Sequence, residues 1–110
     1  MTELAGKTCT PCRGGVPPMD QAEAERYLHD APGWTLMAAG TRIERTFKLR
    51  NFKEALALVN RIGALAEEEG HHPDITFGWG YVTVSLHTHK IKGLHENDFI
   101  MAAKINRLVD

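Results

Sequence analysis

Residues 51–88, NFKEALALVNRIGALAEEEGHHPDITFGWGYVTVSLHT, decide the fold of this chain. Apolar side chains recur at helical spacing over 51–70, which predicts one long helix. Two runs rich in β-branched and aromatic residues follow, 75–77 and 81–88, with a Gly-Trp-Gly segment between them. Apolar and polar residues alternate in the second run, as they do in a half-buried strand. We therefore expect a helix followed by a β-hairpin.

The predicted long helix begins with a capping-box pattern, because Asn51 is followed by Glu54. Leu58 and Leu65 lie off its main apolar stripe and widen its apolar face beyond what one sheet should cover. A second subunit is the expected cover for this extra surface. The stripe itself comprises Phe52, Ala55, Leu56, Val59, Ile62, Gly63 and Ala66.

The flanking segments predict a further hairpin and two further helices. Residues 34–37 and 41–49 flank a turn and predict two strands, whereas residues 20–29 and 96–109 have helical apolar spacing. The element order is then α-β-β-α-β-β-α. The order contains two hairpins, and its helices cannot all connect parallel strands. It therefore predicts an α+β domain with a four-stranded antiparallel sheet and helices packed on one face.

The whole chain has the size and composition of one ordinary globular domain. It has 110 residues, of which 43% are hydrophobic and 25% charged. The net charge of -1 provides no general attraction to nucleic acid or to anionic membranes. No stretch approaches the roughly 20 apolar residues that a spanning helix needs, and the N-terminus has no signal-peptide pattern. We expect a cytoplasmic protein without a membrane or nucleic-acid partner.

Residues 1–19 form a leader that contains Gly, Pro and Cys, and we expect it to be flexible, with residues 20–110 forming the single domain. Cys9 and Cys12 have C-x-x-C spacing. Structural zinc needs four Cys or His ligands, and a redox pair needs a βα setting that the leader lacks. We expect this cysteine pair to be inert or to bind metal only opportunistically.

Four of the six histidines lie close together in the sequence. His71 and His72 directly follow the end of the predicted long helix, and His87 and His89 lie two residues apart at the end of a predicted strand. Imidazole titrates near neutral pH, so histidines at such positions suit general acid–base catalysis. Histidines are also often exposed polar residues without catalytic function, and the residue pattern alone leaves both interpretations open.

Residues 70–105, GHHPDITFGWGYVTVSLHTHKIKGLHENDFIMAAKI, together with Glu67, resemble the pterin-4a-carbinolamine dehydratase family. The family motif has an acidic residue, three spacers, His-His-Pro, an aromatic residue, a distant His and a final Asp. The leader and His87 lie outside this motif. At the start of the last helix, His95 stands where family members often have Ser or Thr, so weaker capping is expected there. The matching residues are Glu67, His71, His72, Pro73, Trp79, His89 and Asp98.

The resemblance implies a hydro-lyase, 4a-hydroxytetrahydrobiopterin dehydratase, that converts 4a-hydroxy-tetrahydropterin to quinonoid dihydropterin and water in tetrahydropterin recycling. It implies that His71, His72 and His89 are catalytic, with His72 and His89 as the acid–base pair and His71 orienting the pterin. Because the elimination needs only proton transfers, neither a cofactor nor a metal site is expected. The implied supporting or substrate-binding residues are Glu67, Pro73, Asp74, Trp79, Thr88 and Asp98.

The implied partners are a small pterin substrate and other copies of this chain, in a homodimer or homotetramer. A functional link to an aromatic amino acid hydroxylase is also implied. Two alternatives stay open. One is a dimerisation or coactivator module, because mammalian members of the family act as dimerisation cofactors of a homeodomain transcription factor. The other is a metal-binding protein that uses its histidines as ligands.

Overall fold

One four-stranded antiparallel sheet forms the base of the computed structural model, which describes residues 4–10 and 17–109. The strand order is β1-β2-β4-β3, so β1 and β3 are the edge strands. The strands are β1 (Thr35–Met37), β2 (Arg42–Lys48), β3 (Asp74–Gly78) and β4 (Tyr81–Leu86). The helices are α1 (Gln21–Leu28), α2 (Phe52–Glu69) and α3 (Glu96–Val109), and the short 3-10 helices are η1 (Leu4–Gly6), η2 (Ala38–Gly40) and η3 (His89–Ile91).

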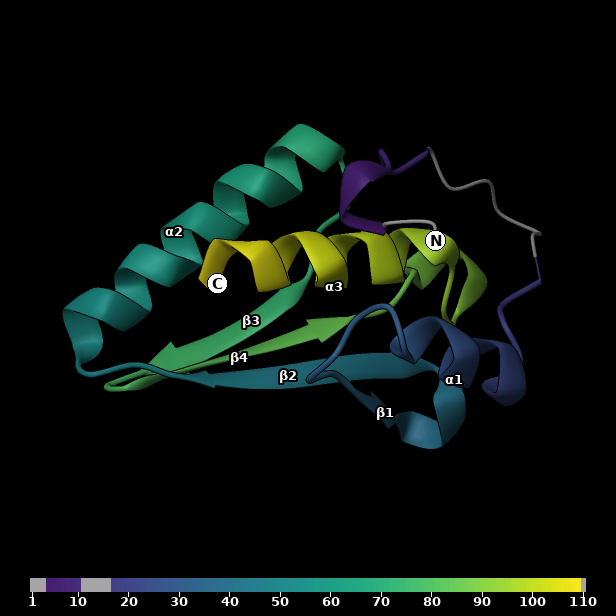
Figure 1. Cartoon of the computed structure of the whole chain (residues 1–110), viewed down its shortest axis with the longest axis horizontal. Helices are drawn as coiled ribbons and strands as arrows, with labels where there is room; N and C mark the ends of the chain where they lie inside the picture. The colour runs from purple at the N-terminus through teal and green to yellow at the C-terminus, as the bar shows by residue number, and fades with distance from the viewer. Residues whose placement is uncertain (1–3, 11–16, 110) are drawn as a thin grey trace.

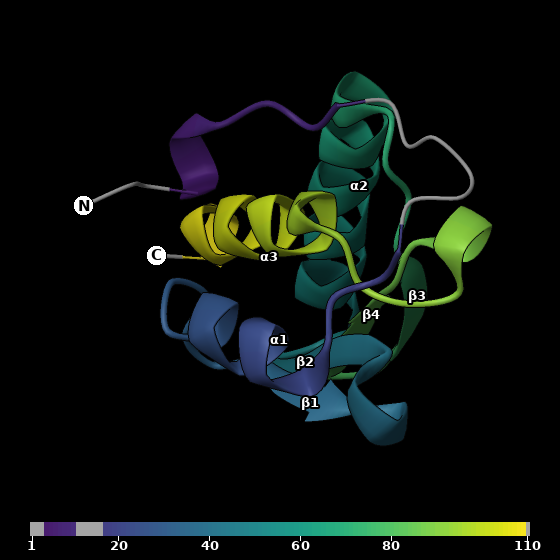
Figure 2. The ribbon, with the colours of Figure 1, turned by 90° about the vertical axis from the view of Figure 1, so that its right-hand side faces the viewer.

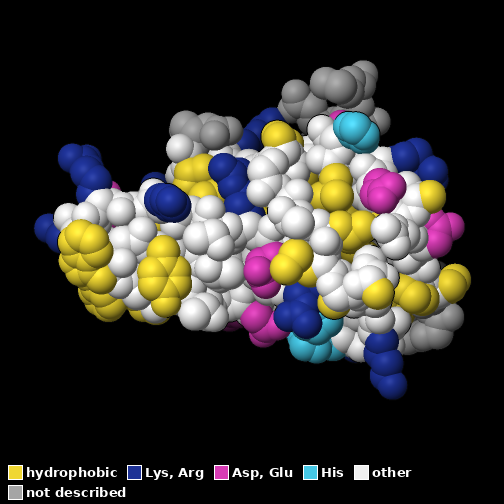
Figure 3. Space-filling model, turned by 90° about the horizontal axis from the view of Figure 1, so that it is seen from below, with side chains coloured by type: hydrophobic (Ala, Val, Ile, Leu, Met, Phe, Trp, Pro, Cys, Tyr) yellow, Lys and Arg dark blue, Asp and Glu magenta, His cyan; other side chains and the backbone are white. Residues whose placement is uncertain are grey.

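The predicted α+β architecture is confirmed. Leaving the 3-10 turns aside, the element order is α-β-β-α-β-β-α, and all three strand pairs are antiparallel. The helices lie on one side of the sheet (Figures 1 and 2). Figure 3 looks onto the opposite side, which no described helix covers. None of the helices within 4–10 and 17–109 is long and apolar enough to cross a bilayer.

The hydrophobic core lies between the sheet and the helices, because alternate residues of the strands face that way. In β2 and β4 the positions that alternate toward the helices are fully or almost fully buried, and α3 contributes a largely buried helix between α1 and α2. The uncovered side of the sheet is polar, and Thr46 and Thr83 are hydrogen-bonded to each other there at 2.9 Å. The strand residues of the core are Ile43, Phe47, Val82, Val84 and Leu86.

The face of α2 that packs on the sheet differs from the predicted one. Leu58, which we expected to lie off the stripe, is fully buried, whereas Phe52 and Leu56 are 46% and 40% exposed. The expectation was wrong because the apolar side of this helix is wide enough for two overlapping faces, and periodicity alone does not choose between them. Phe52 packs its ring on Phe77 of β3, with 5.5 Å between ring centroids. The buried residues of α2 are Ala55, Leu58, Ile62 and Ala66.

Residues 4–10, the first described part of the leader, lie against α3. Leu4 is buried in the core, and the Lys7 ammonium lies 2.7 Å from a carboxylate oxygen of Glu96. The rest of the described contacts join this segment to the first turn of α3 and the last turn of α2. The division of the chain into a flexible leader, residues 1–19, and a domain, residues 20–110, stays a prediction.

Cys9 links the leader to the end of α2. Its backbone N–H donates to Glu69 Oε1 at 2.9 Å, and Lys104 Nζ lies 3.4 Å from the other oxygen of the same carboxylate. The backbone N–H of Cys9, and then the Lys104 ammonium, hold the pKa of Glu69 below its usual value. Burial raises the pKa of the Cys9 thiol to about 12, so this thiol is protonated at neutral pH. Cys12, its C-x-x-C partner, lies outside the described residues.

Candidate active site

His71 is held by a buried carboxylate. α2 ends at Gly70, whose left-handed backbone (φ 67°) turns the chain, and His71 follows directly. His71 Nε2 lies 2.6 Å from Asp98 Oδ1, and the two side chains are 11% and 0% exposed. Asp98 also accepts hydrogen bonds from the Thr88 hydroxyl at 2.8 Å and from the backbone N–H of His95 at 3.0 Å. Asp98 therefore connects the end of α2, the end of β4 and the start of α3.

The start of α3 is capped, although we expected weaker capping at His95. His95 Nδ1 accepts a hydrogen bond from the backbone N–H of Asn97 at 3.0 Å. In return, the Asp98 carboxylate accepts the backbone N–H of His95. This arrangement is similar to a capping box, but the acceptor is an imidazole nitrogen and the donor is the second residue of the helix, not the third. That this cap is weaker than one from Ser or Thr stays a prediction.

His72 is paired with Glu67 at the surface. Its Nε2 lies 2.5 Å from Glu67 Oε2, and both side chains are exposed. Glu67 is in the last turns of α2 and His72 is just beyond the helix end, so the pair spans the turn at Gly70. The two adjacent histidines thus each have a carboxylate partner, one in the core and one at the surface.

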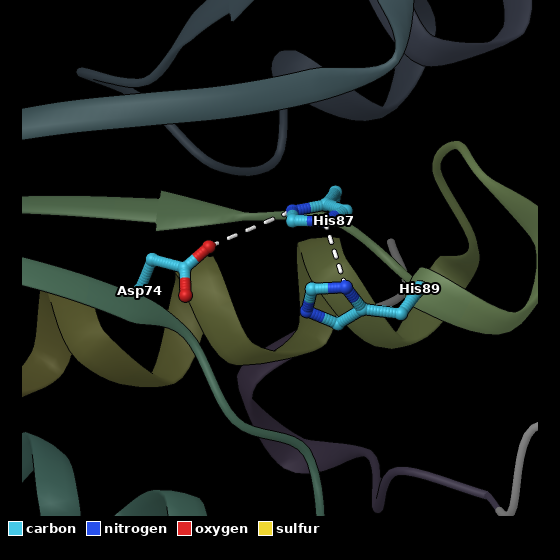
Figure 4. Close-up of side chains that lie close together, drawn as sticks. All are labelled: Asp74, His87 and His89. Atoms are coloured by element: carbon cyan, nitrogen blue, oxygen red, sulfur yellow. Dashed lines mark hydrogen bonds and ion pairs between the residues drawn. The ribbon is translucent and has the colours of Figure 1, made fainter.

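His89 lies at the start of η3 and pairs with His87. His87 Nε2 and His89 Nδ1 are 3.2 Å apart, and their ring centroids are separated by 4.1 Å. His87 Nδ1 also lies 4.0 Å from Asp74 Oδ2, at the beginning of β3. Figure 4 shows the three side chains turned toward one another. His87, which the motif does not include, therefore lies directly beside a predicted catalytic residue.

An open pocket of about 500 Å³ lies where these elements meet. It brings together all three predicted catalytic histidines, His71, His72 and His89, from two different segments of the chain. Glu67 and Asp98 do not line it, but each is hydrogen-bonded to a histidine that does. The remaining lining residues are Thr10, Gly70, Pro73, Asp74, His87, Thr88, Lys90 and Asn97.

Trp79 is a third predicted site residue that does not line this pocket. It lies between β3 and β4 in the hairpin turn, where its side chain is 73% exposed. The pocket is at the opposite ends of both strands, near Asp74 and His87. Within one chain, Trp79 therefore does not contact a bound molecule in this pocket.

Thr10, Lys90 and Asn97 line the pocket but were not singled out from the sequence. The backbone N–H of Thr10 donates to Asn97 Oδ1 at 3.0 Å, and Asn97 Nδ2 donates to the carbonyl of Thr10 at 2.6 Å. Asn97 precedes a motif residue and could have been suspected from that position. No signal in the sequence indicates Thr10, because only the docking of the leader brings it to the pocket.

Comparison with known proteins identifies the family of this chain. The family model for pterin 4 alpha carbinolamine dehydratase matches residues 17–108. The chain belongs to the pterin-4a-carbinolamine dehydratase family. The predicted membership in this family of hydro-lyases is thus confirmed, and the match covers nearly the whole predicted domain.

Relatives that carry the name of pterin-4-alpha-carbinolamine dehydratase match almost end to end. One from Cupriavidus pinatubonensis is 59% identical over 106 residues, which is 96% of this chain and 91% of the relative. One from an Azoarcus species is 58% identical and covers 98% of this chain and 92% of the relative.

Solved structures share the pterin dehydratase fold. A protein from Brucella melitensis described as a transcriptional coactivator/pterin dehydratase superposes with a TM-score of 0.79 at 29% identity, covering 84% of this chain and 99% of that one. A pterin dehydratase-like protein described as a RuBisCO assembly factor in the alpha-carboxysome superposes with a TM-score of 0.61 at 26% identity, covering 70% and 89%. The fold therefore occurs in proteins described by both catalytic and protein-binding functions.

Proposed function

We propose that this protein dehydrates 4a-hydroxy-tetrahydropterin to quinonoid dihydropterin and water by histidine acid–base catalysis. The observation that carries the proposal is the convergence of His71, His72 and His89 on one open pocket. Family membership supports the substrate class, because the named relatives match over almost their entire length. The pocket is also large enough for a bicyclic ring of pterin size.

The reaction needs one proton donor and one proton acceptor. The C4a–O bond breaks as the hydroxyl is protonated and leaves as water, and a carbon–nitrogen double bond forms as the ring loses an N–H proton. We assign these transfers to His72 and His89, which line the pocket from different segments of the chain. Each such transfer typically accelerates a reaction by about 10²- to 10⁴-fold. Because the two proton transfers complete the chemistry, the reaction requires no cofactor or metal.

His71 is better suited to bind and orient the pterin. Its Nε2 is occupied by the buried Asp98 carboxylate, so only its other ring nitrogen remains to meet a ligand. Asp98 is a positioning residue, since it acts on the pocket through His71 and Thr88. Glu67 has the same relation to His72 at the surface. Pro73 and Asp74, in the pocket lining, complete the wall on the β3 side.

The activity is tested by mixing the protein with freshly generated 4a-hydroxy-tetrahydropterin and following dehydration by its absorbance change. We expect a rate well above that of buffer alone and proportional to protein concentration. A rate equal to that of buffer would contradict the proposed function. The physiological setting that we propose is cytoplasmic recycling of a tetrahydropterin used by an aromatic amino acid hydroxylase.

Self-association is part of the proposal. The exposed side chains Phe52 and Leu56 on α2 and the open edge of β3 provide an apolar surface and unpaired strand backbone on the same side of the molecule. We propose that copies of this chain cover this surface in a homodimer or homotetramer. The protein-binding functions described for the two structural neighbours are functions of those proteins, and the acidic net charge here offers no separate support for a nucleic-acid partner.

A further inference from the structure

Asp74, His87 and His89 form a cluster in which the proposed reaction gives no role to His87. His87 has no part in the proton transfers, yet its ring lies between Asp74 and His89 (Figure 4). One ligand atom from each of the three side chains lies within 4.8 Å of the others. No other group of three His, Cys, Asp or Glu residues in 4–10 and 17–109 meets this condition.

The distance between the two imidazoles fits a shared metal ion. Nitrogen ligands lie about 2.0–2.1 Å from tetrahedral zinc, so two of them are about 3.3 Å apart. His87 Nε2 and His89 Nδ1 are 3.2 Å apart. Asp74 Oδ2 is 4.0 Å from His87 Nδ1, the other nitrogen of that ring, so the exposed Asp74 side chain must rotate to bring an oxygen to the same ion. Two nitrogens and one oxygen are a common ligand set for zinc, with the remaining position open to water.

The backbone holds these residues in place. In the register of β3 and β4, Asp74 is directly opposite Ser85, and His87 lies two residues beyond Ser85, on the same side of the sheet. This is the polar side that no described helix covers, where Figure 3 shows histidine, acidic and basic side chains grouped together. The Ser85 hydroxyl is buried and has no hydrogen-bond partner among the described residues. A water molecule bound to an ion at this cluster would give the Ser85 hydroxyl the hydrogen-bond partner that it lacks.

We propose that Asp74, His87 and His89 bind one divalent transition-metal ion, with Zn²⁺ as the representative ion, and that the bound ion inhibits the dehydratase by occupying His89. Two imidazole ligands favour zinc, nickel or copper over magnesium and calcium, which prefer oxygen ligands. The inhibitory part rests on the proposed function, because it assumes that His89 transfers a proton. Metal binding itself does not depend on that function.

Binding is tested on the full chain after removal of metal with a chelator. Equilibrium dialysis against Zn²⁺ should give one bound ion per chain, and Co²⁺ as a spectroscopic substitute should produce visible absorption bands of a four- or five-coordinate site. His87→Ala should lower the zinc affinity by about 10-fold or more, since the loss of outer-shell partners alone costs about 10- to 100-fold. Asp74→Asn, an exposed and nearly isosteric change, provides a second variant in case His87→Ala does not fold.

Two control variants separate this site from other ligands. His29→Ala removes an exposed histidine at the end of α1, and Cys9→Ser with Cys12→Ser removes the leader cysteines; both should keep one bound zinc. The high pKa of the Cys9 thiol already makes Cys9 a poor zinc ligand. Zinc binding that is lost in the cysteine variant, or kept in both His87→Ala and Asp74→Asn, would overturn the proposal, as would wild-type protein that binds no zinc.

The inhibitory part is tested by comparing each protein with itself, with and without zinc. Wild-type dehydratase activity should fall as zinc fills the site and return with chelator. In His87→Ala the same zinc concentration should inhibit at least about 10-fold less, matching the loss of affinity. Zinc binding without inhibition would refute the link to His89, whereas a wild-type protein that binds zinc but shows no dehydration would refute the proposed function alone.

Discussion

His72 and His89 reach one pocket from different segments, the turn after α2 and the start of η3, so each can be removed without disturbing the other's backbone. We predict that His72→Ala and His89→Ala each lower kcat about 10²- to 10⁴-fold, the typical contribution of a positioned acid or base. Steady-state dehydration kinetics measure this effect, with circular dichroism to show that the fold is kept. His29→Ala, far along the chain at the end of α1, is the matched control and should keep wild-type turnover. Wild-type turnover in His72→Ala or His89→Ala would remove that histidine from the mechanism.

Asp98 and Glu67 make the same kind of bond to neighbouring histidines in opposite environments. Asp98 is fully buried and accepts three hydrogen bonds, so Asp98→Asn leaves buried polar groups poorly paired. We predict that Asp98→Asn lowers the free energy of unfolding by about 1–3 kcal/mol. Glu67→Gln disrupts an exposed pair and should change the free energy of unfolding by less than about 0.5 kcal/mol. Urea unfolding of both variants checks this, and equal losses would show that burial does not determine the difference.

The motif named the candidate site residues, but it did not indicate which side chains pair with which. His71 and Asp98 are 27 residues apart and the sequence places both in the site, yet their contact depends on how α3 packs against the end of α2. His87 lies outside the motif, and its spacing of two residues from His89 indicated a shared side of the sheet but not the contact between their rings. A motif in the sequence shows which residue types occur at which positions. Contacts between side chains that are far apart in the sequence depend on the tertiary fold.

At the scale of elements, the helices and strands were predictable, because capping patterns, helical spacing and strand alternation are local properties. The buried face of α2 was not predictable. Phe52, Leu56 and Leu58 are all apolar, and only packing against the sheet determines that Leu58 is the one that is buried. The docking of residues 4–10 on α3 was also not predictable. It depends on side chains such as Glu69 and Asn97, which lie far from the leader in the sequence.

Glu69 makes the attachment of the leader dependent on pH. Its pKa is lowered in the folded protein, mainly by the backbone N–H of Cys9, so the ionised carboxylate stabilises the fold above the ordinary glutamate pKa of 4.5. As the pH falls below 4.5 and through the lowered pKa, the carboxylate takes up a proton and this stabilisation is lost. We predict that Glu69→Gln reduces the loss of thermal stability between neutral pH and about pH 3, relative to wild type. Melting temperatures across this range measure the effect.

The matched control for Glu69 is its neighbour Glu68, which is exposed. Glu68→Gln removes the same charge from the last turn of α2 but has no described contact with the leader. It should leave the acid dependence of the melting temperature close to that of wild type. If Glu68→Gln and Glu69→Gln change the acid profile equally, the effect belongs to the charge of the helix end and not to the contact with Cys9.

At the scale of the whole molecule, a single chain leaves apolar side chains of α2 and one edge of the sheet uncovered, which we propose that other copies cover. We predict that the wild-type protein is a dimer or tetramer in solution, and that Leu56→Glu, which places a charge in this apolar surface, lowers its mass in light scattering coupled to size-exclusion chromatography. Ala22→Glu adds the same charge to an exposed position of α1 and should leave the mass unchanged. A monomeric wild type would refute the proposed self-association, and an unchanged mass of Leu56→Glu would place the interface on another surface. Because the pocket lies at the far end of α2 from Leu56, dissociation should reduce activity only if a neighbouring copy completes the site.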